Sequence, residues 1–374
     1  MRLSLFLLQQ IIISLTLVLG RTNAQECARD NYTARNQSAL DSISSNCTEI
    51  SGEIGLVDWS GPLTLHNITR ARSIRVYSGD VSSVDFPSLE SLESDLLLTD
   101  LPSLRRVSLP RLEEAEGLYV DFVGERPQLD ISRLKNASSL YLRGNLSEES
   151  FDALQYVDKK IDICNAVNCG YYSRMEVSTS MNLDFPVLER VGSFVVGGNV
   201  SRLSTPELSN ITCKDCDWAA LHLKLYGSSL IQVDFPKLAA MNGTIYVRGD
   251  IESISLPILR KYTNDFIAVP YEPLNITLPV EKADGFLFTG NVSSIQLPSL
   301  HSFSRIHIDS DLDFDCDKVW KGIDRTSGPL NESTKEEYFQ CSVGVSLFDS
   351  SGLGFFETVG IAMVLGFGIL GGLL

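Results

Sequence analysis

The sequence predicts an all-β fold, a right-handed β-solenoid of about 12 coils of about 21 residues each, with disulfide-bonded caps. Three recurring features predict it: a short strand that alternates apolar and variable residues, a Gly-Asn or Gly-Asp turn, and a second strand that ends in an apolar-Pro-x-Leu corner. A single coil cannot bury its own apolar side, so the coils are expected to stack and share one continuous core.

The first strand of each coil sets the period. Clear copies are Gly117–Val120, Ser139–Leu142 and Thr244–Val247. The first apolar position of each copy falls at residues 54, 74, 96, 118, 140, 161, 194, 223, 245, 266, 286 and 306. Two intervals are long, 33 residues (161 to 194) and 29 residues (194 to 223), and they contain Cys164 with Cys169 and Cys213 with Cys216.

The turn and the corner have separate physical causes. Glycine tolerates positive φ and Asn or Asp bonds its own backbone, so "RGN" at 143–145 and "TGN" at 289–291 predict turns. Proline cannot donate to a strand ladder, so it is expected to close the second strand, as in Phe86-Pro87-Ser88-Leu89. The similar Leu101-Pro102-Ser103-Leu104 falls between two such corners and predicts a different corner of the same coil.

Both ends carry targeting signals. Arg2, an apolar run over 3–19 and "RTNAQE" predict a signal peptide, residues 1–24. The segment 342–374 ends in the apolar, Gly-rich run 358–374, which contains no Lys or Arg. It predicts a spacer and a GPI-attachment signal, with Ser350, Ser351 and Gly352 as candidate attachment residues. A single membrane span is the alternative.

Sequons and cysteines are typical of a protein from the secretory pathway. Twelve sequons predict N-glycosylation at Asn31, Asn36, Asn46, Asn67, Asn136, Asn145, Asn199, Asn210, Asn242, Asn275, Asn291 and Asn331. The eight cysteines fall in near pairs: Cys27 and Cys47, Cys164 and Cys169, Cys213 and Cys216, Cys316 and Cys341. Pairing within each near pair is the simplest proposal, and sequence alone leaves the connectivity open.

The chain resembles the fungal GPI-anchored cell-wall organisation proteins, a family with receptor L-domain-like repeats that includes sporulation-specific members. The resemblance rests on "ALDSISSNCTEISGEI" (39–54), "LPSLRRVSLPRL" (101–112), "LDFPVLERVGSFVV" (183–196), and "LDFDCD" followed by "EYFQC" (337–341). It implies two L-domain-like solenoid units, 25–180 and 181–341, in a non-catalytic glycoprotein that supports wall assembly. A Ser/Thr-rich stalk before the anchor is nearly lacking, which favours membrane anchorage over cross-linking to the wall.

Few residues suggest chemistry. The net charge of −16 makes nucleic acid an unlikely partner. We expect no catalytic residue, metal site or cofactor: the four histidines form no metal motif, and Cys213-Lys-Asp-Cys216 predicts a structural disulfide rather than a zinc or redox site. The run Asp309–Asp317 resembles a calcium loop superficially, but alternation of inward Leu312, Phe314 and Cys316 with outward acids accounts for it better.

Two surface features remain. The outward acids Asp85, Asp130, Asp184 and Asp234 could serve a polysaccharide hydrolase, the enzymatic alternative, but they are spread along the coils. The outward middle residues of the first strands are Arg75, Leu97, Tyr119, Tyr141, Asp162, Tyr246, Ile267, Leu287 and His307. Tyr119 and Tyr141 are expected to stack one coil apart and, with Tyr246, to form a candidate ligand face; a ladder that only stabilises the coils is the alternative.

These observations predict a non-enzymatic, GPI-anchored glycoprotein of the fungal surface. Its expected location is the outer leaflet of the plasma membrane, the cell wall, or both. The expected partners are the membrane, through the lipid anchor, and wall glucan or mannoprotein. The second hypothesis is a receptor-like ectodomain that binds a soluble ligand, and the third is a wall-remodelling hydrolase.

Overall fold

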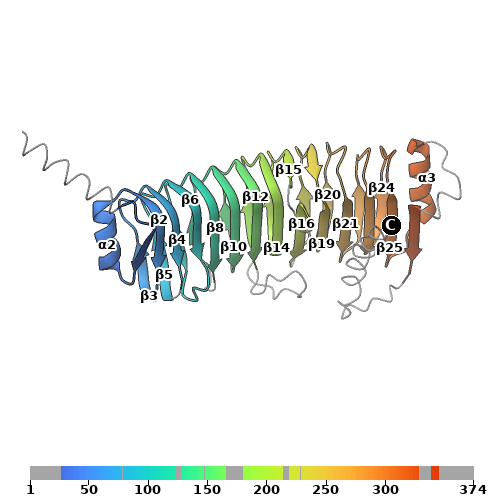
Figure 1. Ribbon diagram of the computed structural model, residues 1–374. Helices are drawn as coiled ribbons and strands as arrows, with labels where there is room; N and C mark the ends of the chain where they lie inside the picture. The colour runs from blue at the N-terminus through green and yellow to red at the C-terminus, as the bar shows by residue number, and fades with distance from the viewer. Residues whose placement is uncertain are drawn as a thin grey trace, which may run out of the picture.

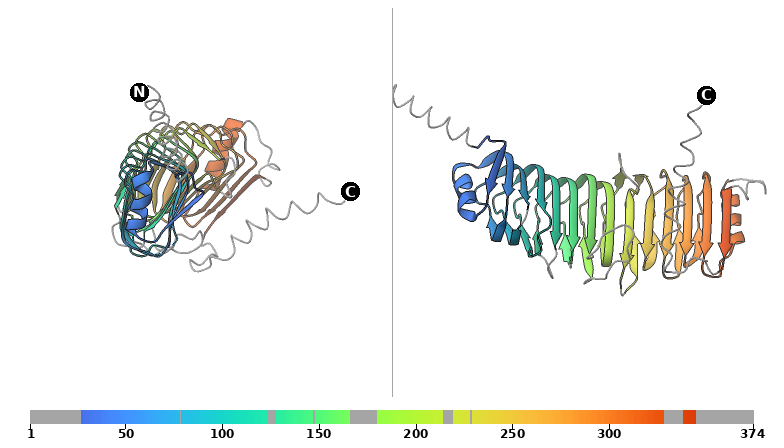
Figure 2. Two further views of the ribbon diagram at one scale, coloured as in Figure 1. Left: turned by 60° about the vertical axis from the view of Figure 1, so that its left-hand side comes forward. Right: turned by 60° about the horizontal axis from the view of Figure 1, so that its bottom comes forward.

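The computed structural model describes residues 27–344 except 78, 123–127, 147, 166–179, 214–218, 228 and 328–337. These residues form a β-solenoid of about 11 turns, as the repeat predicts. Figure 1 shows the coils stacked side by side into an elongated rod, with α2 at one end and α3 at the other. The end-on view in Figure 2 shows the coils superimposed around one shared interior.

The main sheet runs the length of the rod and receives the first strand of every coil. Its successive strands are parallel: β1 (Asn31–Ala34), β2 (Glu49–Leu56), β4 (Arg70–Val76), β6 (Ser91–Leu98), β8 (Glu114–Phe122), β10 (Asn136–Gly144), β12 (Tyr156–Asn165), β14 (Arg190–Ser204), β16 (Leu221–Tyr226), β19 (Ile245–Gly249), β21 (Asp265–Pro270), β23 (Gly285–Gly290), β25 (Arg305–Ser310) and β26 (Phe339–Val343). This ladder continues from β12 to β14 without an intervening strand. The division into two solenoid units, 25–180 and 181–341, stays a prediction.

Shorter strands build the other two sides of each coil. The second side holds β3 (Trp59–Thr64), β5 (Gly79–Asp85), β7 (Arg106–Ser108), β9 (Gln128–Asp130), β11 (Glu148–Ser150), β13 (Met181–Asp184), the end of β14, β17 (Ile231–Asp234), β20 (Ile251–Ser255), β22 (Leu274–Thr277) and β24 (Val292–Gln296). The third side holds the first residues of the longer main-sheet strands together with β15 (Asn210–Thr212) and β18 (Ala240–Asn242).

The register of the paired strands confirms the period of the repeat and corrects the predicted inward residue of one coil. Ile54, Ile74, Leu96, Leu118, Leu140, Ile161 and Phe194 occupy equivalent inward positions of successive strands, and all are buried. The next member is Leu221, which pairs with Phe194 and with Ile245, so the assignment of Leu223 was wrong by two residues. The sequence Leu221–Leu225 alternates perfectly, and the pattern cannot distinguish one inward leucine from the next.

The Pro-x-Leu segments are tight turns at the corners. The N–H of Leu89 donates to the carbonyl of Phe86 at 3.4 Å, and that of Leu112 donates to Leu109 at 3.1 Å. Leu104 donates to Leu101 in the same way at 3.1 Å, but this turn precedes β7 whereas the other two follow β5 and β7. The prediction of two different corners in one coil is therefore confirmed.

Each end of the rod is closed by a helix and a disulfide. At one end α2 (Gln37–Asn46) accompanies the Cys27–Cys47 disulfide, and its N-cap Asn36 accepts the N–H of Ala39 at 2.9 Å. At the other end α3 (Cys316–Ser327) accompanies the Cys316–Cys341 disulfide. The disulfide caps were predicted, but the two helices were not.

The acidic run 309–317 is a strand only at its beginning. β25 ends at Ser310 and α3 begins at Cys316, so the extended run expected from alternation was wrong in its secondary structure. Burial still alternates as expected, with Phe314 buried and Asp313 and Asp315 exposed. Asp315 Oδ1 accepts the N–H of Lys318 at 2.9 Å, so this acid caps the helix.

Candidate functional site

The outward face of the main sheet carries one continuous row of side chains, here called the central row. Strand pairing joins Thr33, Gly55, Arg75, Leu97, Tyr119, Tyr141, Asp162, Val195, His222, Tyr246, Ile267, Leu287, His307 and Gln340 in this order. Every residue of the predicted row is present in it. His222 was missed because the predicted register of its coil was wrong by two residues. Val195 was left out of the predicted row although the position of Phe194 beside it was predicted correctly.

Tyr119 and Tyr141 form a stacked pair on neighbouring strands of this row. Their ring centroids lie 4.8 Å apart and their planes differ by 15°. The parallel, in-register pairing of β8 with β10 brings identical side chains to strand spacing, which suits offset stacking. Both rings are partly exposed, so the tyrosine pair presents an aromatic surface at the outside of the rod.

Charged side chains adjoin the tyrosine pair. Lys160 Nζ lies 5.4 Å from the centroid of Tyr141 and 2.8 Å from Asp162 Oδ2. Arg143 Nη2 lies 3.8 Å from the same carboxylate oxygen. Asp162 is only 7% exposed and is engaged by these two cations, so it positions them beside the rings. Donors therefore stand beside an apolar ring surface, an arrangement that can hydrogen-bond and stack against one ligand at once.

A second aromatic and cationic cluster lies further along the main sheet. His222 and Tyr246 meet edge to face with centroids 4.9 Å apart, and Arg248 Nε donates to the hydroxyl of Tyr271 at 2.7 Å. Tyr226 packs against Tyr271 at 5.8 Å. Tyr246 is four strands beyond Tyr141, about 19 Å at the usual strand spacing, so the structure does not bring it to the tyrosine pair.

Burial sets the charge state of His222 in this cluster. Its side chain is only 5% exposed. Burial, followed by the positive charges of Lys224 and Lys160, lowers the pKa of His222 to about 3. The imidazole is therefore neutral near pH 7, and its role in the cluster is packing against Tyr246.

The predicted glycosylation sites differ in exposure. Asn31, Asn36, Asn46, Asn67 and Asn275 are exposed, and Asn136, Asn145, Asn210, Asn242 and Asn291 are partly buried. Asn199 is only 8% exposed. Asn242 uses both ends of its amide on the backbone of Cys213, accepting its N–H at 2.6 Å and donating to its carbonyl at 2.9 Å. Asn331 lies outside the described residues, and glycosylation stays a prediction at every site.

Several sequence-based predictions fall partly or wholly outside the described residues. Cys164 and Cys213 are disulfide-bonded, but Cys169 and Cys216 are not described, so those two pairings stay predictions. The signal peptide and the attachment candidates Ser350, Ser351 and Gly352 also lie outside the described range. Within that range, no helix has both the length and the apolar character needed to cross a membrane.

The acids considered for hydrolysis do not form adjacent pairs. On the second side Asp85 and Asp130 are separated by Ser108, with which both pair, and Asp184 has Ser204 as its neighbour. Asp234 lies in β17, which is the first strand of a separate group of paired strands. In the part of the chain that is described, no group of three or more His, Cys, Asp or Glu side chains is placed to hold a metal ion.

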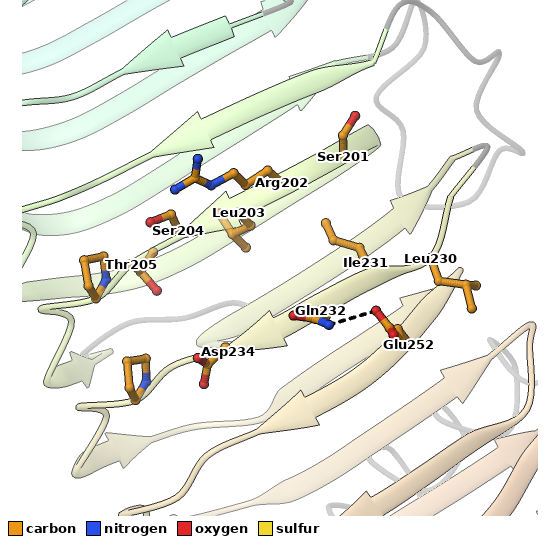
Figure 3. Close-up of a pocket in the computed structure, with 12 residues that line it drawn as sticks. Ser201, Arg202, Leu203, Ser204, Thr205, Leu230, Ile231, Gln232, Asp234 and Glu252 are labelled. Carbon is orange, nitrogen blue, oxygen red and sulfur yellow. Dashed lines mark hydrogen bonds between the residues drawn. The ribbon is translucent and has the colours of Figure 1, made fainter.

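A cleft opens on the second side where the strand ladder is interrupted. β14 pairs there with β13, and β17 pairs with β20, but no pairing between described residues joins β14 to β17 on this side. The cleft has a volume of about 460 Å³. Figure 3 shows Arg202 and Ser204 on the β14 side, and Gln232, Asp234 and Glu252 on the other, with Gln232 donating to Glu252 at 3.0 Å. The sequence repeat did not predict this cleft.

Comparison with known proteins adds no relative. No family model, no curated protein and no solved structure matches this chain.

Proposed function

We propose that this protein is a non-catalytic, GPI-anchored surface glycoprotein that binds an extended wall polysaccharide along its main sheet. The observation that carries the proposal is the stacked pair of Tyr119 and Tyr141, with Lys160 and Asp162 beside it. A sugar ring has an apolar C–H face that packs on an aromatic ring, and hydroxyls that both donate and accept. The tyrosine pair supplies the stacking surface, and Lys160 and Arg143, which Asp162 holds in place, supply donors for the hydroxyls.

The distribution of sequons supports the same face. The central row contains no sequon asparagine. The described sequon asparagines lie instead in β1, at or near α2, at the corners, or on the second and third sides, as Asn275 in β22 does. Bulky glycans at those positions would leave the central row of the main sheet uncovered. This face is therefore open to a large partner even on a heavily glycosylated rod.

The shape of the rod suits an extended ligand. The central row crosses every strand of the main sheet, so it runs along the rod axis. A linear polymer lying on this row would meet the tyrosine pair first and the cluster around Tyr246 further along. Support for a fungal wall as the setting comes from the end signals and from the resemblance to wall-organisation proteins, which both remain expectations.

The experiment is cosedimentation of the purified full-length protein with insoluble β-glucan, mannan and chitin. Wild-type protein is expected to sediment with at least one of them. Replacing both tyrosines (Tyr119→Ser and Tyr141→Ser) should weaken that binding about tenfold, because two aromatic contacts of about 0.5–1.5 kcal/mol each are lost.

The matched control is Tyr156→Ser. Tyr156 stands at the start of β12, outside the central row, where it bonds Glu189 and contacts Arg190. This variant should bind as wild type does. Equal binding by the double variant, at unchanged thermal stability, would refute the proposal. Cleavage of any polymer during the assay would favour the hydrolase, and binding of a soluble ligand without polymer would favour the receptor-like alternative.

A further inference from the structure

The coil that borders the cleft departs from its neighbours at one core position. The residue that opens each Pro-containing corner is large and apolar elsewhere on the second side, as at Phe86, Leu109, Phe185, Phe235, Leu256, Leu278 and Leu297. The equivalent residue of the β14 coil is Thr205, next to Phe185 in the ladder. Among the described residues, the second-side ladder lacks a pairing between β9 and β11 and again between β14 and β17. The small polar residue occurs in the coil that borders the second of these interruptions.

Thr205 carries an unsatisfied hydroxyl. Its side chain is 2% exposed, and Oγ1 has no hydrogen-bond partner among the described residues. A buried hydroxyl without a partner is destabilising, so natural cores rarely contain one. Thr205 lines the cleft together with Arg202 and Asp234. Because this hydroxyl is shielded from solvent, a ligand in the cleft would bond the exposed side chains and backbone groups around Thr205 and not this oxygen.

The interruption also directs backbone groups at the cleft. The N–H of Phe185 donates to Ser204 O at 2.9 Å, and that of Phe235 donates to Ser255 O at 3.0 Å. Successive residues of a strand direct their N–H and C=O groups to opposite neighbours. The backbone of Leu203 therefore faces the cleft from one side, and the backbone of Gln232 and Asp234 faces it from the other.

We propose that this cleft binds one or two neutral hexose units. Arg202 and the backbone N–H groups donate, while Asp234, Glu252 and the backbone carbonyls accept. Sugar hydroxyls do both, so a polyol can satisfy this mixture. Two carboxylates disfavour an anionic ligand, and Arg202 disfavours a cation. The volume of about 460 Å³ is at the smaller end of ligand sites.

The site is independent of the one on the main sheet, because the two lie on different sides of the coil.

The test is saturation-transfer NMR of the full-length protein, with any N-linked glycans trimmed enzymatically, against cellobiose, laminaribiose, gentiobiose and mannobiose. Wild type should bind at least one of them. Arg202→Gln should weaken binding about fivefold through the loss of a charged donor, and Asp234→Asn about tenfold through the loss of a charged acceptor.

Matched controls come from the same side of the rod. Arg106→Gln in β7 and Asp130→Asn in β9 change similar residues outside the cleft and should bind as wild type does. The variant with Tyr119→Ser and Tyr141→Ser should also retain disaccharide binding, so failure here is distinguishable from failure of the polymer proposal. No binding of any disaccharide by wild type, or binding by the Arg202 and Asp234 variants equal to that of wild type, would overturn the inference.

Discussion

Gly117 leaves the space into which the ring of Tyr119 leans. A Cβ at residue 117 would lie 2.5 Å from Cε2 of Tyr119 and would also collide with Oδ1 of Asp95. Gly117 is two residues before Tyr119 on the same outward face of β8. The geometry of the tyrosine pair thus depends on the lack of a side chain at this position.

Gly117→Ala should therefore disturb the tyrosine pair without removing either tyrosine. The added methyl group displaces the Tyr119 ring from its stack on Tyr141, so polysaccharide binding should fall severalfold in cosedimentation. Gly322→Ala in α3 is the control, because a Cβ there meets no atom within 4 Å and alanine favours a helix. Undiminished binding by Gly117→Ala would contradict the assigned role of the pair.

Thr205→Val should stabilise the protein. The change removes a buried hydroxyl that has no partner among the described residues and keeps the shape of the side chain. The free energy of unfolding should rise by about 1 kcal/mol, measured by urea denaturation. The exposed Thr277→Val should change it by less than about 0.5 kcal/mol. A loss of stability in Thr205→Val would show that the hydroxyl is satisfied in solution.

We expect Phe194 to compensate for the small side chain of Thr205. Its ring meets Phe185 at 5.5 Å and Phe235 at 6.2 Å, both edge to face, and those two residues occupy the positions on either side of Thr205 in the stack. Thr205→Phe alone should overpack the core and cost about 1–3 kcal/mol. Combined with Phe194→Leu, it should cost less than the sum of the single changes. Simple additivity in this cycle would contradict the compensation.

His222 should make stability depend on pH. Its folded pKa of about 3 lies below the ordinary value near 6.5, so only the unfolded chain takes up the proton between these values. The contribution is complete above about pH 6.5 and is lost as the pH falls, by up to about 2 kcal/mol at pH 5. His222→Gln should reduce this loss in urea midpoints at pH 7 and 5, whereas the exposed His301→Gln should not. An equal loss of stability between pH 7 and pH 5 in both variants would contradict the role of His222 in this pH dependence.

Sequon occupancy should follow exposure. Asn67 and Asn275 are exposed and should carry glycans, whereas the buried Asn199 and the doubly bonded Asn242 should not. Glycopeptide mass spectrometry of the protein, expressed in a eukaryotic host that attaches N-linked glycans, measures this site by site. Full occupancy at Asn242 together with an intact fold would show that its amide bonds to Cys213 are dispensable.

The repeat made the fold predictable because each coil obeys the same rule. Apolar alternation fixed which residues face inward, and the Pro corners fixed where the second strand ends, so the stacking of Tyr119 on Tyr141 followed. The rule failed where the coils change length. Leu221–Leu225 could be shifted by two residues without exposing a leucine, which hid His222 from the central row.

Other features depend on tertiary context that no local pattern contains. The helix α2 has only Leu40 and Ser44 buried, so its apolar periodicity is weak. The cleft arises because two neighbouring coils pair on the main sheet and on the third side but not on the second. Thr205 stands out only when its position is compared with Phe185 and Phe235, which requires the correct register of all three coils.

The most direct test of polysaccharide binding by the tyrosine pair replaces both tyrosines by phenylalanine, which keeps the rings. The variant with Tyr119→Phe and Tyr141→Phe is compared with that carrying Tyr119→Ser and Tyr141→Ser by affinity electrophoresis in gels containing soluble β-glucan or mannan. We expect the phenylalanine variant to be retarded nearly as strongly as wild type, because stacking carries the contact. We expect the serine variant to need about tenfold more polymer for the same retardation. Equal retardation of the serine variant and wild type would contradict polysaccharide binding by the pair.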